Sequence, residues 1–238
     1  MTRSPQWRAI WALLRFAAGA LAAAAIIAQL QVSIANATQS TTPHGSHVAT
    51  VVANFLSFFT IQSNLLAAIV LVIGGIYLLT RGRNEREEPR WFGLALACVS
   101  TYMIVTGIVY NLLLRGIDLP QGSAPIPWSN EVLHVVIPVF LLLDVLFAPR
   151  RRALPWSSAG LIVIFPIAWV VYTLLRAPLI TTPGNGDAFW YPYPFLNPNN
   201  FEAGYAVVAL YVVGIAVAIV VVALFVVWVS RRRGVRTS

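Results

Sequence analysis

Long apolar runs alternate with short polar stretches along the whole chain. Each run is close to the length of about 20 residues that an α-helix needs to cross the hydrocarbon core of a bilayer. The runs lack the two-residue alternation that is typical of membrane β-barrel strands. The pattern predicts an all-α polytopic membrane protein, a single domain over residues 1–238 with six transmembrane helices near 10–30, 56–79, 91–114, 132–147, 158–175 and 206–229.

Composition supports this interpretation. Hydrophobic residues make up 58% of the chain and charged residues only 10%, whereas about 25% of the residues in a soluble domain are charged. All sixteen basic residues are arginine, and they outnumber the eight acidic residues. Because the arginines occur in short clusters between apolar runs and not along one face, we expect no nucleic-acid partner.

The arginine clusters also predict an orientation. Most arginines fall in segments that share one side of the membrane. The loops on the opposite side hold only Arg115 and Arg176, and Arg15 lies inside the first run. The positive-inside rule therefore places both termini in the cytoplasm, with the protein in the cell membrane. The arginines of the cytoplasmic side are Arg3, Arg8, Arg81, Arg83, Arg86, Arg90, Arg150, Arg151, Arg152, Arg231, Arg232, Arg233 and Arg236.

The first run has a second interpretation. Residues 1–37 combine a basic start, an apolar stretch and the small-residue sequence Ala35-Asn-Ala37, as a cleavable secretory signal does. Cleavage would leave five spans. We favour an uncleaved span, because Arg15 interrupts the start and the run is long enough to cross a bilayer.

Polar side chains inside the runs fall at a similar depth. Thr60 precedes Arg81 by twenty-one residues and His134 precedes Arg150 by sixteen, which correspond to about 31 Å and about 24 Å of helix. Polar groups within a bilayer are costly and usually face the bundle interior. We therefore expect one shared, outward-opening cavity, although each hydroxyl alone could simply bond its own helix. The same layer contains Gln29, Thr106, Tyr110, Asn111, Tyr172, Thr173 and Tyr211.

The segment SNEVLHVVIPVFLLLD, residues 129–144, carries the chemistry of the fourth run. His134 is a side chain that can accept and return a proton near neutral pH. Glu131 precedes it by three residues and is expected to orient or pair with its ring. Asp144 lies about 9 Å from Arg150 along a helix, so we expect it to pair with the inner arginines.

Several classes of function are disfavoured. The sequence contains no G-x-S-x-G, H-E-x-x-H, Walker or G-x-G-x-x-G motif. Glu131-x-x-His134 matches half of a di-iron carboxylate site, but a second copy is missing. We therefore expect no metal and no other cofactor. The loop at 181–202 is rich in aromatic residues and is either an interfacial belt or a lid over the cavity.

A family resemblance rests on the block Asn130-Glu-Val-Leu-His134 with Pro138 and Leu141-Leu-Leu-Asp144, and on Trp190 and Tyr193-Pro-Phe-Leu196. These residues resemble the androgen-induced protein family, six-span membrane proteins whose animal members hydrolyse fatty acid esters of hydroxy fatty acids. The resemblance implies a catalytic threonine in the second span and a histidine in the fourth. Thr60 and His134 match them, and Ser57 is the rival for the threonine position.

The leading hypothesis is therefore an integral membrane lipid-ester hydrolase in which Thr60 is the nucleophile and His134 the base. Its partners would be a lipid or amphiphilic ester substrate and the surrounding membrane lipids. A non-catalytic carrier or receptor for an amphiphile and a structural membrane protein are the alternatives. Further candidates for oxyanion stabilisation or substrate binding are Asn64, Tyr110, Asn111, Ser57, Glu131, Asn130 and Tyr193.

Overall fold

The computed structural model describes residues 5–41, 44, 47–117, 119 and 125–234. Within these residues all regular structure is helical, which confirms the predicted all-α class. Arg3 and Arg236, which contribute to the predicted orientation, lie outside the described residues. Six of the described helical segments are long and apolar enough to cross a membrane, at Pro5–Gln39, Phe59–Leu79, Arg90–Leu114, Pro127–Phe147, Ser158–Leu179 and Tyr205–Arg233.

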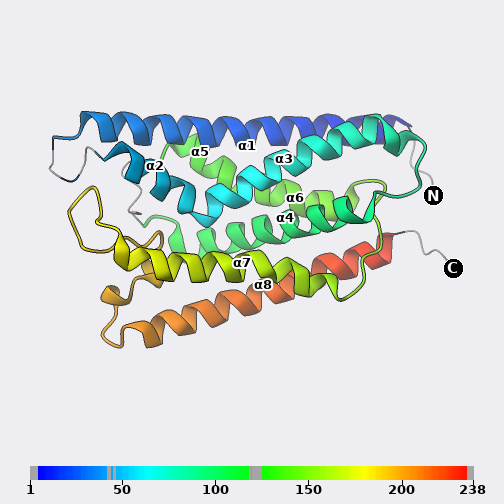
Figure 1. Cartoon of the computed structure of the whole chain (residues 1–238). Helices are drawn as coiled ribbons and strands as arrows, with labels where there is room; N and C mark the ends of the chain where they lie inside the picture. Colours follow the sequence, from blue (N-terminus) through cyan, green and yellow to red (C-terminus); the bar gives the residue numbers. More distant parts are fainter. Residues whose placement is uncertain (1–4, 42–43, 45–46, 118, 120–124, 235–238) are drawn as a thin grey trace.

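The helices form a bundle in which neighbours along the chain are mostly neighbours in space (Figure 1). Helix α1 (Pro5–Gln39) packs along α3 (Phe59–Leu79), and α4 (Arg90–Val109) lies between α3 and the pair α6 (Ile137–Phe147) and α8 (Tyr205–Arg233). The buried face of α1 consists mostly of small residues, alanine above all, which let two helix backbones approach closely in a membrane.

Helix α1 begins and α8 ends at the same end of the bundle (Figure 1). We call this the basic end, because the arginine clusters around Arg81, Arg151 and Arg232 lie there. Helix α7 (Ser158–Arg176) also begins there and packs against α8. A chain that begins and ends at the same end of the bundle crosses it an even number of times, as the predicted six spans require.

A buried cluster of charges joins the helices near the basic end. Asp144 Oδ1 lies 2.8 Å from Arg15 Nε, and its Oδ2 lies 2.7 Å from Arg151 Nη2. The expected pairing of Asp144 with inner arginines is thus confirmed through Arg151, and Arg15 of the first span is an additional partner. A β-carbon on Gly74 would lie 2.7 Å from Arg15 Nη1, so glycine leaves the space that the guanidinium fills.

The second span differs from the prediction because it is not one continuous helix over 56–79. Helix α2 (Val48–Ser57) ends and α3 begins at Phe58, whose backbone is extended, with φ −66° and ψ 131°. Side chains from elsewhere satisfy the freed backbone groups: Trp169 Nε1 donates to the Ser57 carbonyl at 2.9 Å, and the Thr60 N–H donates to the Tyr193 hydroxyl at 3.3 Å.

The third and fourth spans each contain a π-helical turn, η2 (Tyr110–Leu114) and η3 (Val132–Val136). Pro138 has no N–H, so the carbonyl of His134 lacks the usual helical donor four residues later. A β-carbon on Gly107 would lie 2.8 Å from Pro138 Cβ, so this glycine lets α4 approach the turn closely. Turns of this kind are frequent at functional sites.

The loop at 181–202 folds over the end of the bundle opposite the basic end. Trp190 is only 2% exposed, and Tyr191, Tyr193 and Phe195 are also buried. The rings of Trp190 and Tyr193 pack edge-on against Phe58, with centroids 5.5 and 5.6 Å away. Of the two interpretations of this loop, the buried aromatic residues favour a lid over an interfacial belt.

Candidate functional site

The break in the second span determines where Thr60 lies. Because α3 starts at Phe59, Thr60 is in the first turn of a helix, where backbone N–H groups have no intrahelical acceptor. Its side chain is buried, and its Oγ1 lies 3.3 Å from the hydroxyl of Tyr193. The same hydroxyl accepts the Thr60 N–H, so Tyr193 bonds both the backbone N–H and the side-chain hydroxyl of this residue.

Aromatic packing fixes the position of Tyr193. Its ring stacks on Phe195 with centroids 5.3 Å apart and contacts Trp169 at 5.9 Å. Burial raises the pKa of the Tyr193 phenol above its ordinary value, although the hydrogen bonds to Thr60 act in the opposite direction. The hydroxyl therefore keeps its proton and remains a hydrogen-bond donor.

His134 is oriented by its own helix. Its Nδ1 lies 2.9 Å from the carbonyl oxygen of Asn130. Since a carbonyl can only accept, Nδ1 carries the proton and Nε2 carries the lone pair. The ring of Tyr110 stacks on the imidazole with centroids 3.9 Å apart, and the hydroxyl of Tyr110 bonds the Asn130 amide. The arrangement leaves Nε2 available to take a proton.

Thr60 and His134 line the same small cavity, of about 40 Å³. Tyr193 also lines it, and Gln29 of α1 contributes a further polar side chain. The Gln29 Oε1 accepts the backbone N–H of Ile126 at 2.9 Å, which fixes the start of α5 (Pro127–Glu131). Because several polar side chains line this space, a water molecule can bond there close to both the threonine and the histidine.

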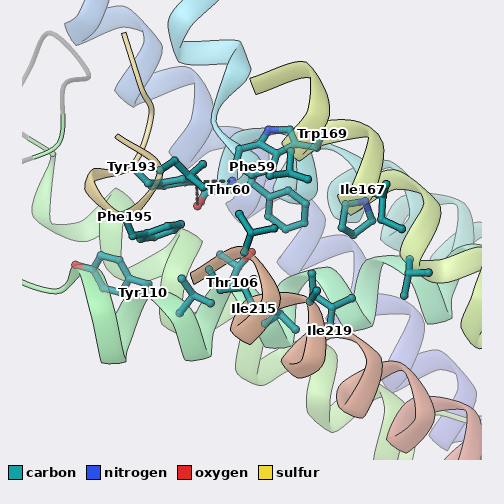
Figure 2. Close-up of a pocket in the computed structure, with 18 of the residues that line it drawn as sticks. Phe59, Thr60, Thr106, Tyr110, Ile167, Trp169, Tyr193, Phe195, Ile215 and Ile219 are labelled. Atoms are coloured by element: carbon teal, nitrogen blue, oxygen red, sulfur yellow. Dashed lines mark hydrogen bonds between the residues drawn. The ribbon is translucent and has the colours of Figure 1, made fainter. Parts of the chain in front are cut away.

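A larger cavity of about 220 Å³ lies between α4, α7 and α8. Figure 2 shows Thr60, Tyr193 and Tyr110 toward one end of it and Ile167 and Ile219 toward the other. The polar groups therefore gather at one end of an otherwise apolar space. A molecule with a polar group at one end and a long apolar tail matches this distribution.

The single cavity expected from the polar layer is instead two cavities, with Thr60 and Tyr193 in the walls of both. Other members of the layer lie apart from them. Tyr172 is exposed on α7, with its hydroxyl 3.0 Å from Ser57 Oγ, and Tyr211 packs against Phe195 at 5.8 Å. Equal depth along the helices therefore brought together only some of the predicted residues.

Two candidate oxyanion donors serve to brace helices. The amide of Asn64 donates to the carbonyls of Thr60, at 2.9 Å, and Leu133, at 3.2 Å, and so joins α3 to η3. The amide of Asn111 donates to the Gly107 carbonyl of its own helix at 2.8 Å and reaches the His134 carbonyl of η3 at 3.5 Å. Neither residue lines either cavity, so the structure assigns them to bracing in place of the predicted role.

Ser57 and Glu131 also lie away from the cavities. The Ser57 hydroxyl donates to the Ala53 carbonyl at 2.7 Å, on the other side of the helix break from Thr60. Glu131 forms a two-bond ion pair with Arg115, at 2.8 and 3.1 Å, and is about half exposed. The expected orientation of His134 by Glu131 is thus replaced by the Asn130 carbonyl.

Sequence reasoning named Asn130 and Tyr193 but did not find how they act. The four-residue spacing between Asn130 and His134 was an available signal, because a side chain within a helix can reach the carbonyl four residues before it. No comparable local signal links Tyr193 to Thr60, since they are 133 residues apart and meet only through tertiary packing. The sequence also does not predict the helix break that leaves the Thr60 N–H without an acceptor in its own helix.

Comparison with protein-family models, with curated proteins and with solved structures finds no match to this chain. A functional assignment therefore has to rest on the geometry of Thr60, His134, Tyr193 and the two cavities, together with the chemistry that these groups can perform.

Proposed function

We propose that the protein is an integral membrane lipid-ester hydrolase in which Thr60 is the nucleophile and His134 the general base. One observation carries the proposal: both residues line one small cavity, and the Asn130 carbonyl leaves His134 Nε2 as the proton acceptor. A neutral alcohol is a poor nucleophile unless a base lies within reach, directly or through one water. The adjoining apolar cavity supplies room for a lipid substrate.

The reaction proceeds in two half-reactions. Thr60 Oγ1 attacks the ester carbonyl while its proton passes to His134 Nε2, directly or through a water in the small cavity. The hydroxyl of Tyr193, already 3.3 Å from Oγ1, donates to the oxyanion of the tetrahedral intermediate. The intermediate collapses to an acyl-threonine, and His134 returns the proton to the leaving alkoxide.

Water completes the cycle. His134 takes a proton from a water molecule, whose oxygen attacks the acyl-threonine carbonyl. Collapse of this second intermediate releases the carboxylic acid and returns the proton to Thr60. The net change is ester plus water to acid plus alcohol, with both residues restored.

The membrane setting belongs to the same proposal. With both termini cytoplasmic, in the cell membrane, the site lies toward the outer leaflet and the membrane lipids surround it. A lipid or amphiphilic ester then reaches the cavities from the bilayer. The residue pattern around His134 and Tyr193 that resembles the androgen-induced protein family supports this chemistry.

The test is hydrolysis of a fatty acyl ester by the purified protein in liposomes. His134→Ala should lower kcat by about 10²–10⁴-fold, the usual range for loss of a general base, and Thr60→Ala, which removes the nucleophile, should lower it at least as much. Ser57→Ala is the matched control, one turn earlier in sequence and outside both cavities, and should leave kcat unchanged. Full activity of a folded Thr60→Ala protein would rule the mechanism out.

A second candidate function is a non-catalytic carrier for an amphiphile. The size of the large cavity and its apolar wall, with polar groups at one end, favour this function. In that case the wild-type protein binds a fatty acid or ester in liposomes without turnover, and Thr60→Ala retains the affinity. Measurable hydrolysis that depends on His134 would exclude this alternative.

A further inference from the structure

We infer that the two cavities divide an ester substrate at its carbonyl, so that the acyl chain lies in the large cavity and the leaving alcohol in the small one. The substrate class is then a long-chain acyl ester of a compact alcohol, which differs in its alcohol part from the fatty acid esters of hydroxy fatty acids that animal members of the androgen-induced protein family hydrolyse. This inference rests on the proposed hydrolase function and adds the direction in which the substrate lies.

The position of His134 fixes the side from which the alcohol leaves. The leaving alkoxide has to receive its proton from the base, so its oxygen must lie next to His134. His134 lines the small cavity and not the large one. Because Thr60 lies in the wall of both, the attacked carbonyl sits between them and the acyl chain has to extend away from His134.

The large cavity has the shape and chemistry of an acyl-chain site. On α8 its wall runs from Val212 to Val220, which is about 12 Å of helix. Ile215 and Ile219 point into it from α8, and Pro166 lines it from α7 (Figure 2). Beyond Thr106 the wall carries only apolar side chains among the described residues. Such a space favours methylene groups and offers no partner for a second polar group.

A hydrogen bond next to Pro166 joins this wall to α4. Proline leaves the Ile162 carbonyl without its helical donor, and the hydroxyl of Tyr102 supplies one at 2.8 Å. The proline therefore leaves no unpaired carbonyl at this position, and the replacement bond connects α7 to α4.

The small cavity differs from the large one in size and in its mixed lining. Polar side chains such as His134, Gln29 and Ser129 line it beside apolar ones such as Phe55 and Leu133, and its volume is about 40 Å³ against about 220 Å³ for the large cavity. A methyl or ethyl group fits such a space, whereas a second long chain does not. The size difference therefore selects for a compact leaving alcohol.

The first experiment varies the acyl chain with methyl butyrate and methyl palmitate as substrates. Ile219→Trp, which fills the far end of the large cavity, should lower kcat/KM for the palmitate by at least about tenfold and leave the butyrate within about twofold. Val221→Trp, on an exposed part of α8 outside the cavity, is the matched control and should change neither. Equal effects of Ile219→Trp on both esters would overturn the inference.

The second experiment varies the alcohol with methyl and butyl decanoate. Leu133 lines only the small cavity, so Leu133→Ala should raise the rate for the butyl ester relative to the methyl ester by at least about tenfold. The preference of the Leu133→Ala variant between short and long acyl chains should stay the same as that of the wild type. A change in acyl preference instead would reverse the assignment of the two cavities.

A third experiment separates this inference from the hydrolase function. A palmitate analogue with a photoreactive group at the chain end is bound to the Thr60→Ala protein, and as a free acid it carries no ester bond to be cleaved. Crosslinking to α8 near Ile219 supports the acyl site even if no ester is hydrolysed. Crosslinking outside the large cavity, in a protein that does hydrolyse esters, would overturn the inference while the function stands.

Discussion

At the scale of single residues, the hydroxyl of Tyr193 is the group on which the site depends most. It lies 3.3 Å from both the Oγ1 and the backbone nitrogen of Thr60, and buried aromatic rings hold it there. Its raised pKa keeps it a donor at neutral pH. A donor fixed beside a nucleophile stabilises charge that develops in the transition state without reorganising.

We therefore expect Tyr193→Phe to lower kcat for ester hydrolysis by about 10²–10³-fold, the range for loss of one oxyanion donor. The ring packing is kept but the Thr60 N–H loses its acceptor, so the melting temperature should fall only modestly and kcat is compared well below it. Tyr191→Phe, in the same loop but outside both cavities, is the control and removes only a contact to the Tyr205 hydroxyl. A Tyr193→Phe protein with full kcat would remove this residue from the mechanism.

The candidate residues could be identified from the sequence only in part. Thr60 and His134 were found by family resemblance and by their similar depth, and the two indeed line one cavity. Asn64 and Asn111 share that depth but face helix carbonyls, because residue counting gives height and not direction around the helix axis. The partners of Tyr193 depend on how the lid folds, and no local pattern encodes that.

At the scale of helices, three interruptions surround the site: the extended Phe58 and the π-helical turns η2 and η3. The apolar runs predicted the spans but not these interruptions, because hydropathy describes side chains and carries no information on backbone dihedral angles. Pro138 was a visible signal, since a proline frees the carbonyl four residues earlier. The break at Phe58 has no such signal and is sustained by Trp169 and Tyr193.

Pro138→Ala restores a backbone N–H opposite the His134 carbonyl and should draw η3 toward a regular α-helix. We expect the melting temperature to stay equal or rise, because a helix-breaking residue is removed. Hydrolysis should fall by at least about tenfold, since rotation of His134 by a fraction of a turn moves Nε2 from its position. An active protein of unchanged kcat would show that the π-helical turn is not required.

At the scale of the whole molecule, charge distribution organises the bundle. The sequence correctly predicted that Asp144 pairs with arginine near the basic end, yet it treated Arg15 as an interruption of the first span. In the structure Arg15 and Asp144 are both fully buried and join α1 to α6. Cleavage after Ala37 would remove Arg15 from this pair, so the structure links α1 to the integrity of the bundle.

Asp144→Leu should lower the free energy of unfolding by about 3–5 kcal/mol, because it removes the carboxylate that pairs with the buried Arg15 and Arg151. The double variant Arg15→Met with Asp144→Leu should recover part of this loss, since Arg15 is then no longer a buried charge without Asp144, whereas Arg151 still lacks it. Equilibrium unfolding in mixed micelles measures the free energy of unfolding of the single and the double variant. A single variant as stable as the wild type would contradict the structural role of the pair.

The orientation of the bundle can be tested with cysteine labelling. Cys98 is the only cysteine, so a Cys98→Ser background accepts single new ones. With both termini cytoplasmic, Asn185→Cys in the lid should react with an impermeant maleimide on intact cells, and Arg83→Cys should react only after permeabilisation. The reverse pattern would place the site at the cytoplasmic face.

The most direct test of the central claim is the residue that forms a covalent adduct. The protein in liposomes is treated with an alkyl fluorophosphonate, digested and analysed by mass spectrometry. We expect a phosphonyl adduct on Thr60 that is lost in His134→Ala and unchanged in Ser57→Ala. An adduct on Ser57, or undiminished labelling of Thr60 without His134, would contradict the proposed pair of nucleophile and base.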